Sequence, residues 1–143
     1  MDRSGTLLYD GDCGLCIAAA TWLSQVVPAA RLDLLALQQV DAHPRIAERV
    51  RGRALDAALH FVRADGAVLT GARAALATGR LVPIFGLYAA LLDRPSGHAL
   101  LEPLYREIAS HRRRIGRLLG LPVECPLPLR IHGPSEGSSD ADA

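Results

Sequence analysis

The chain has 143 residues, of which 50% are hydrophobic, and a formal net charge of +1 at pH 7. These values are typical of one globular domain with a buried core, and the balanced charge is not typical of a nucleic-acid-binding protein. The longest apolar run, residues 81–92, is interrupted by Pro83 and Gly86 and is too short to span a membrane. The first apolar segment, residues 6–9, is too short for the core of a secretion signal, so we expect a cytoplasmic protein.

The first two predicted elements meet at a motif with two cysteines. Residues 6–9 read as a short buried strand, and a helix follows from residue 13 onward. The helix is indicated by apolar positions at helical spacing, namely Cys16, Ala20, Leu23 and Val27. Cys13 and Cys16 therefore belong to the first turn, where unpaired backbone N–H groups and the helix dipole favour a thiolate.

Two thiols three residues apart at a helix start are typical of dithiol redox chemistry. We predict that Cys13, nearer the mouth of the site, is the nucleophile that attacks a partner disulfide. Cys16, on the side of the helix that faces the core, would then resolve the mixed disulfide. The partners would be a protein or small-molecule disulfide and a cellular thiol reductant, and this chemistry requires no cofactor.

Two other functions use the same cysteines. In a redox sensor or adaptor, the dithiol would switch state and the helical C-terminal half would carry the signal. In a metal-binding module, Cys13 and Cys16 would form half of a zinc site, since such sites use the same spacing. The third cysteine is Cys125, with His132 seven residues beyond it, and that spacing matches no common zinc module.

Several side chains near the motif have two possible roles. Asp10 is a candidate catalytic residue as a proton acceptor for Cys16, or it stabilises the turn by accepting backbone N–H bonds. Trp22 is expected to pack in the core rather than to line a groove. The basic run over residues 111–117 is expected to be a solvated helix face near a C-terminus, where cations suit the helix dipole.

The remaining elements predict the fold class. Residues 31–37 form a second strand, and a strand, helix and strand in succession give a right-handed unit with a parallel pair. A short helix over residues 43–50 follows. Asp65-Gly66 between two apolar runs predicts a hairpin, and a further helix begins after Gly71. This order predicts an α/β protein with a thioredoxin-like mixed four-stranded sheet and flanking helices.

A helical C-terminal extension completes the predicted domain, which spans residues 5–120. Helix is expected from residue 81, with a break at residues 93–97 and a last helix from Pro103 to Gly120. Residues 121–143 are predicted to be a proline-rich, disordered tail.

The motif residues also resemble those of a known family. Asp10, Cys13 and Cys16 fit an Asp-x-x-Cys-x-x-Cys pattern, and shorter matches follow at Leu37-Gln38, Gly71-x-x-Ala74-Ala75-Leu76 and Tyr105-x-x-Ile108-Ala109-x-x-Arg112. Over residues 5–119 the chain thus resembles the DCC family of thiol-disulfide oxidoreductases. The resemblance implies a thioredoxin-like fold and oxidoreductase activity. Thioredoxins have a proline in the loop before the third strand, whereas the matching loop here, residues 52–56, has none.

Overall fold

The first three elements of the fold form the predicted parallel unit. The computed structural model describes residues 5–122, beginning with β1 (Gly5–Tyr9), α1 (Gly14–Val26) and β2 (Leu32–Ala36). The strands β1 and β2 are parallel, with Leu7 opposite Leu34. The prediction of two parallel strands joined by a helix is confirmed.

A hairpin adds two antiparallel strands to this unit. The strands β3 (His60–Arg63) and β4 (Val68–Thr70) pair with each other, and β3 also pairs with β1, giving the order β2-β1-β3-β4. In the connecting turn, Gly66 has a φ of 88°, and the Asp65 carboxylate accepts the Ala67 N–H at 2.9 Å. The helix α3 (Ala72–Gly79) follows. The mixed four-stranded sheet is therefore the thioredoxin-like arrangement that the sequence predicted.

Side chains alternate across the sheet and build a hydrophobic layer on each face. Leu7 and Tyr9 of β1 point into the larger layer, together with buried residues of α1 and α3. Leu8 points into a smaller layer, which is covered by a 3₁₀ helix η1 (Leu37–Ala42) and by α2 (Pro44–Val50). Two turns of a 3₁₀ helix have too little periodicity to be recognised in a sequence, so η1 was not predicted.

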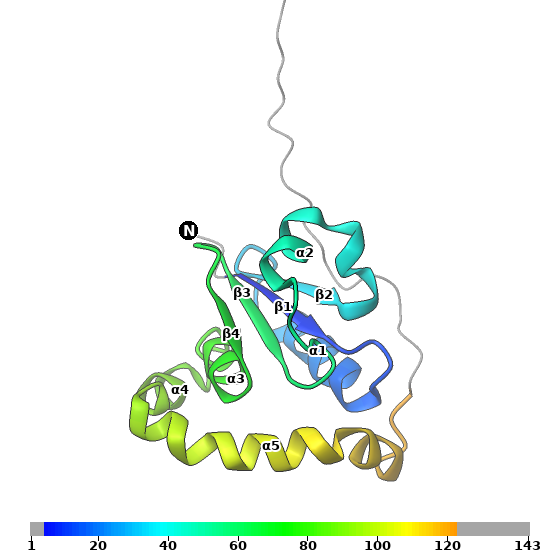
Figure 1. Cartoon of the computed structure of the whole chain (residues 1–143). Coiled ribbons are helices and arrows are strands. Elements are labelled where there is room, and N and C mark those ends of the chain that lie inside the picture. The colour runs from blue at the N-terminus through cyan, green and yellow to red at the C-terminus, as the bar shows by residue number, and fades with distance from the viewer. Residues whose placement is uncertain (1–4, 123–143) are drawn as a thin grey trace, which may run out of the picture.

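The C-terminal half forms the predicted helical extension, but its first helix starts at Gly86 rather than at residue 81, after a series of turns, and its last helix starts earlier than expected. The helix α4 (Gly86–Leu92) is followed by α5 (Pro95–Leu118), which packs against α1, α3 and α4 (Figure 1). Pro95 opens α5 because its missing N–H would have no partner in a first turn. Pro103, which we predicted as the start, lies inside the helix on its exposed side. The long α5 therefore crosses the molecule and reaches the start of α1.

Candidate active site

The two cysteines occupy the start of α1, as predicted. Cys13 is the N-cap residue with an extended backbone, and its Sγ accepts the backbone N–H of Cys16 at 3.4 Å. Both side chains are free thiols. One sulfur thus lies against the unpaired N–H groups of the helix start, where negative charge is stabilised.

The exposure of the two thiols is the reverse of the expected one. Cys13, which we predicted nearer the mouth of the site, is only 1% exposed, whereas Cys16 is half-buried. The backbone next to Cys13 is covered by the end of α5 and the residues that follow it: a Cβ on Gly14 would lie 2.9 Å from the Leu121 carbonyl oxygen, and one on Gly116 would lie 3.2 Å from the Leu15 nitrogen. Helical periodicity places residues on faces of their own helix, so it could not show this distant segment.

The surroundings of Cys16 keep its proton in place. Burial raises the pKa of the Cys16 thiol to about 12, and the hydrogen bond with Cys13 and the Cys13 charge act in the same direction. The positive charge of Arg112 opposes this rise, and the negative charge of Asp10 adds to it. At neutral pH, Cys16 is therefore a thiol that can donate its proton toward the neighbouring sulfur.

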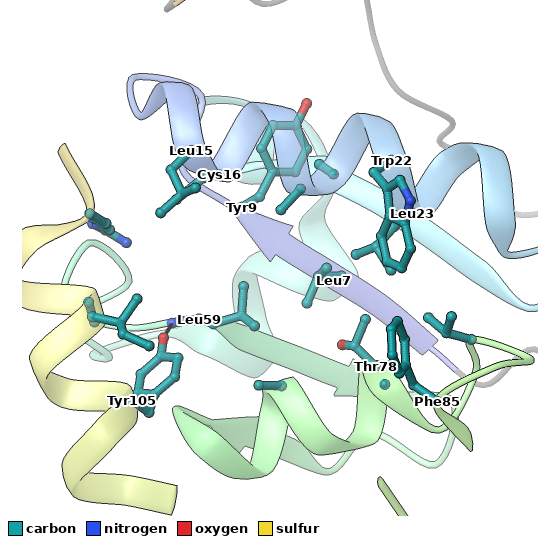
Figure 2. Close-up of a pocket in the computed structure, with 18 residues that line it drawn as sticks. Leu7, Tyr9, Leu15, Cys16, Trp22, Leu23, Leu59, Thr78, Phe85 and Tyr105 are labelled. Carbon is teal, nitrogen blue, oxygen red and sulfur yellow. Dashed lines mark hydrogen bonds between the residues drawn. The ribbon is translucent and has the colours of Figure 1, made fainter. Parts of the chain in front are cut away.

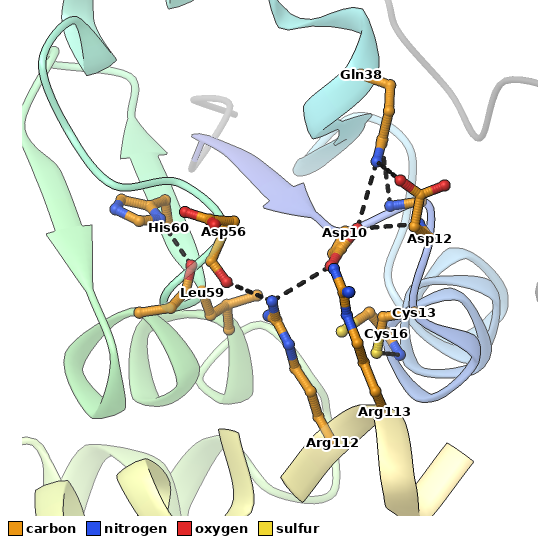
Figure 3. Close-up of polar contacts among 12 residues, drawn as sticks. Asp10, Asp12, Cys13, Cys16, Gln38, Asp56, Leu59, His60, Arg112 and Arg113 are labelled. Carbon is orange, nitrogen blue, oxygen red and sulfur yellow. Dashed lines mark hydrogen bonds and ion pairs between the residues drawn. The ribbon is translucent and has the colours of Figure 1, made fainter. Parts of the chain in front are cut away.

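Asp10 connects the dithiol turn to two other elements (Figure 3). The side chain is 4% exposed and accepts hydrogen bonds from the Asp12 N–H at 2.9 Å and from Gln38 Nε2 at 3.3 Å. Its second oxygen lies 3.2 Å from Arg112 Nη2 and 3.4 Å from Arg113 Nη2. The turn-stabilising contacts that we considered for Asp10 are thus present, together with two ion pairs to α5 that the sequence analysis missed.

These contacts keep the Asp10 carboxyl ionised. Burial alone would raise its pKa, but the hydrogen bonds from Asp12 and Gln38 and the charges of Arg112 and Arg113 outweigh burial and lower it. The carboxylate is therefore a fixed negative charge between the first turn of α1 and the last turns of α5.

Arg112 does not lie on a solvated helix face, as we had expected for the basic run. Its side chain is 14% exposed, and besides Asp10 it donates a hydrogen bond to the Asp56 carbonyl oxygen before β3. The neighbouring Arg113 is largely exposed, in agreement with that expectation. Arg112 belongs to the last of the motif matches to the family, and this match was the signal in the sequence that could have indicated a role for Arg112.

A second α5 side chain contacts the segment before β3. The Leu59 N–H donates a hydrogen bond to the Tyr105 hydroxyl oxygen at 2.5 Å. Burial raises the pKa of Tyr105, so the phenol is neutral at neutral pH. Tyr105 and Arg112 of α5 thus bind the backbone before β3, the segment in which thioredoxins carry their proline.

An apolar groove of about 410 Å³ opens beside Cys16, between α1, α3 and α5 (Figure 2). Trp22, which we expected in the core, lines this groove, is 45% exposed, and has its ring centroid 6.3 Å from that of Phe85. The buried residue at this point of α1 is the adjacent Leu23. The groove is defined here by its main lining residues: Leu15, Cys16, Ala19, Trp22, Ala75, Phe85, Tyr105, Ile108 and Arg112.

The geometry agrees with a comparison against known protein families. The model of the DCC1-like thiol-disulfide oxidoreductase family matches residues 7–118, which include both cysteines, Asp10 and Arg112. The chain belongs to this family. Membership in a family of thiol-disulfide oxidoreductases also agrees with the enzyme class that the cysteine spacing indicated. Comparisons with curated proteins and with solved structures gave no match.

Two further features of this DCC1-like protein bear on other functions. Within residues 5–122, no group of three or more His, Cys, Asp or Glu side chains could hold a metal ion, and no helix could cross a membrane. Cys125 and His132 lie outside the described residues.

His60 is buried with Nδ1 2.8 Å from the Ala58 carbonyl oxygen, and burial lowers its pKa. It is therefore a neutral core histidine.

Proposed function

We propose that this DCC1-like protein exchanges electrons with a partner disulfide through Cys13 and Cys16. The Cys13 thiolate attacks one sulfur of the partner, whose S–S bond breaks as a mixed disulfide forms. Cys16 then loses its proton and attacks the Cys13 sulfur, which releases the reduced partner and leaves a Cys13–Cys16 disulfide. A thiol reductant returns two electrons and two protons to the pair.

The observation that carries this proposal is the asymmetry of the two thiols. The Cys13 sulfur receives the Cys16 N–H, whereas Cys16 retains its own proton with a pKa raised to about 12. One sulfur is thus prepared to carry negative charge and the other to supply a proton, which the two steps require in this order.

Asp10 acts in this proposal as a positioning residue. Its hydrogen bonds fix the turn before Cys13, and its ion pairs hold Arg112 and Arg113 beside the dithiol. Direct acceptance of the Cys16 proton is the alternative role. The pH profile of the resolving step separates the two roles: Asp10→Asn lowers the rate at every pH if Asp10 only positions, and shifts the profile if it accepts the proton.

Attack by Cys13 also requires a change in the cover. Since Cys13 is 1% exposed, we infer that the end of α5 and the residues after it move away from the Gly14 backbone before a partner sulfur makes contact. The contacts that oppose this movement are the Asp10 ion pairs and the close approach of Leu121. We propose that a partner disulfide binds to the opened state.

The proposed compartment is the cytoplasm. Three cysteines are too few for a disulfide framework in a protein of this size, and reducing compartments keep such thiols reduced. The partners proposed are a protein or small-molecule disulfide and a cellular thiol reductant.

Turnover of an insulin-type disulfide substrate with dithiothreitol as reductant tests the proposal. We expect wild-type protein to accelerate reduction and Cys13→Ser and Cys16→Ser to lose that acceleration. Cys125→Ser is the matched control, because it removes a thiol outside the proposed pair, and we expect it to remain active. Undiminished turnover by Cys13→Ser would overturn the proposal.

A redox sensor is the second candidate, and the cover over Cys13 favours it. A dithiol hidden by α5 could report its oxidation state by releasing that helix end. In that case, hydrogen exchange of residues 112–118 would differ between oxidised and reduced protein, and no disulfide substrate would be turned over.

A further inference from the structure

We propose that the reductant of the oxidised pair is an uncharged, apolar low-molecular-weight thiol that enters the apolar groove and attacks Cys16. This rests on the proposed function and assigns its second half-reaction. Partner disulfides would reach Cys13 after the end of α5 has moved, and the reductant would reach Cys16 through the groove.

Access is the first reason to assign this step to Cys16. Cys16 is half-buried and lines the groove, whereas Cys13 is 1% exposed and its neighbour Gly14 lies against the segment that follows α5. Both cysteines belong to one helical turn, so a disulfide between them leaves Cys16 as the sulfur that faces the groove. A thiol in the groove therefore reaches Cys16 without any movement of α5.

The leaving group is the second reason. Attack on Cys16 expels Cys13, and the departing sulfur is positioned at the helix start, where Cys16 donates its N–H. In this first step, attack on Cys13 would instead expel Cys16, whose thiolate is disfavoured by burial; in the proposed order Cys16 leaves only in the second exchange. Thiol-disulfide exchange is faster when the more stable thiolate leaves.

The charge of the groove indicates the chemistry of the thiol. Among the described residues that line it, Arg112 has the only charged side chain, and its guanidinium is already bound to Asp10 and to the Asp56 carbonyl oxygen. No counter-charge remains for a thiol that carries several charges, such as glutathione. Trp22, Phe85 and Ile108 offer exposed apolar surface for an alkyl or aryl group. A cavity of about 410 Å³ has the volume of a small-molecule site.

The step balances with two molecules of thiol. The first thiolate forms a bond to the Cys16 sulfur as the Cys13–Cys16 bond breaks, and Cys13 leaves as a thiolate. A second thiolate then attacks the reductant's sulfur in this mixed disulfide, which yields the disulfide of the reductant and the Cys16 thiolate. Cys16 then takes up a proton. Two thiols are oxidised, and the protein disulfide is reduced by two electrons.

The site of attack can be mapped directly on the oxidised full-length chain. The protein is mixed with 2-phenylethanethiol, quenched in acid within milliseconds, denatured and alkylated with N-ethylmaleimide. Fragment-ion mass spectrometry then locates the phenylethylthio group. We expect it on Cys16, with N-ethylmaleimide on Cys13. An adduct mainly on Cys13, or equally on both, would overturn the proposal.

Selectivity for an apolar thiol is the second test. Reduction rates with 2-phenylethanethiol, 2-mercaptoethanol and glutathione are each divided by the rate of the same thiol with a free small disulfide. Burial of one phenyl group predicts a normalised preference of about tenfold for 2-phenylethanethiol. Equal normalised rates for the three thiols would overturn the proposal.

Filling the groove provides a matched control for that preference. Ala75→Leu adds apolar volume to the groove wall, and we expect it to remove the preference. Ala54→Leu makes the same change at an exposed position outside the groove lining and should retain it. A preference that survives Ala75→Leu would place the apolar thiol elsewhere and contradict the proposal.

Failure of this inference can be distinguished from failure of the proposed function. If insulin-type disulfides are turned over through Cys13 and Cys16 but the thiols show no preference, only the groove assignment is wrong. If no Cys13–Cys16 disulfide forms under oxidising conditions, the proposed function itself is wrong.

Discussion

The two sides of the first turn of α1 differ in almost every respect. On the Cys13 side, the surroundings are polar and closed: the end of α5 packs on the backbone, and Asp10 binds Arg112 and Arg113. On the Cys16 side, the surroundings are apolar and open, with exposed aromatic rings along the groove. Two thiols three residues apart therefore have chemically different surroundings, and of the two only Cys16 lines the groove.

The difference comes from the kinds of contact that build each side. The closed side depends on glycine: Gly14 and Gly116 have no Cβ, which allows two backbone segments to approach closely. On the open side, the groove between α1, α3 and α5 leaves apolar side chains exposed. Changes on the closed side should therefore affect access to Cys13, and changes on the open side should affect reactions at Cys16.

The largest expected effect concerns the pH dependence of Cys16 alkylation. Burial raises the pKa of Cys16 to about 12, so very little of this thiol is ionised at pH 8. In the Cys125→Ser background, we expect the rate of iodoacetamide reaction at Cys16 to rise with pH, without a plateau, over the whole range in which the protein stays folded. Peptide mapping of partly alkylated protein measures this rate. A rate at pH 8 equal to that in concentrated urea would contradict the described surroundings of Cys16.

Loss of the Asp10 charge should open the closed side. Asp10→Asn removes two ion pairs and leaves Arg112 partly buried without a counter-charge. We expect the free energy of unfolding to fall by about 2 kcal/mol, less than for a fully buried pair because Arg113 is exposed. Urea titration at neutral pH measures this change. Asp12→Asn, at an exposed carboxylate, is the control and should change stability by much less.

The same charge predicts an acid dependence. The folded-state pKa of Asp10 is lowered from 3.8, so its contribution is fully present above pH 3.8 and is lost as the pH falls through the folded value. Wild-type protein should therefore lose the stability that Asp10 contributes as the pH falls through this acidic range, and Asp10→Asn should lack that part of the loss. Parallel pH profiles for the two proteins would contradict an ionised, ion-paired Asp10.

A smaller change to the cover tests it without altering charge. Gly14→Ala introduces a Cβ 2.9 Å from the Leu121 carbonyl oxygen, so the end of α5 must shift. We expect the alkylation rate of Cys13 to increase about fivefold, which corresponds to a cost of about 1 kcal/mol in the cover contacts. Gly79→Ala is the control, because its Cβ would meet only the Ala89 methyl group at 3.4 Å. An unchanged rate in Gly14→Ala would mean that the end of α5 does not limit access.

The smallest expected effect is at the contact between α5 and the segment before β3. Tyr105→Phe removes the hydroxyl that accepts the Leu59 N–H, and we expect a loss of about 1 kcal/mol in the free energy of unfolding. Tyr88→Phe, at an exposed ring, should have no measurable effect. Equal stability of the two variants would show that the Tyr105 hydrogen bond does not hold α5 in place.

The sequence predicted the parts of the fold that depend on neighbouring residues. The apolar strand before Cys13, the Asp65-Gly66 turn and the helical spacing after Cys16 are local patterns, and each predicted element is present in the structure. The position of both cysteines at a helix start was predictable for the same reason.

The parts that were missed depend on contacts between distant segments. The pairing of Asp10 with Arg112 joins residues 102 positions apart, and no local pattern contains it. The close approach of Gly14 to Leu121 and the ring contact of Trp22 with Phe85 likewise join segments that are distant in the sequence. Periodicity could place Pro103 only as a breaker, whereas the long helix tolerates it on an exposed face.

A redox titration of the full chain shows whether Cys13 and Cys16 form a reversible dithiol–disulfide couple. The full chain is equilibrated in thiol–disulfide buffers, quenched in acid and analysed by non-reducing peptide mapping. Cys16 keeps its proton, and the negative charge of Asp10 lies beside the dithiol; both oppose the thiolate that the helix start favours at Cys13, so we expect a reducing pair. We expect one two-electron transition to a Cys13–Cys16 disulfide, with a potential near or below the value of about −270 mV for thioredoxin. A potential near that of a strong oxidant, about −120 mV, or a disulfide that joins Cys13 to Cys125 would contradict the account.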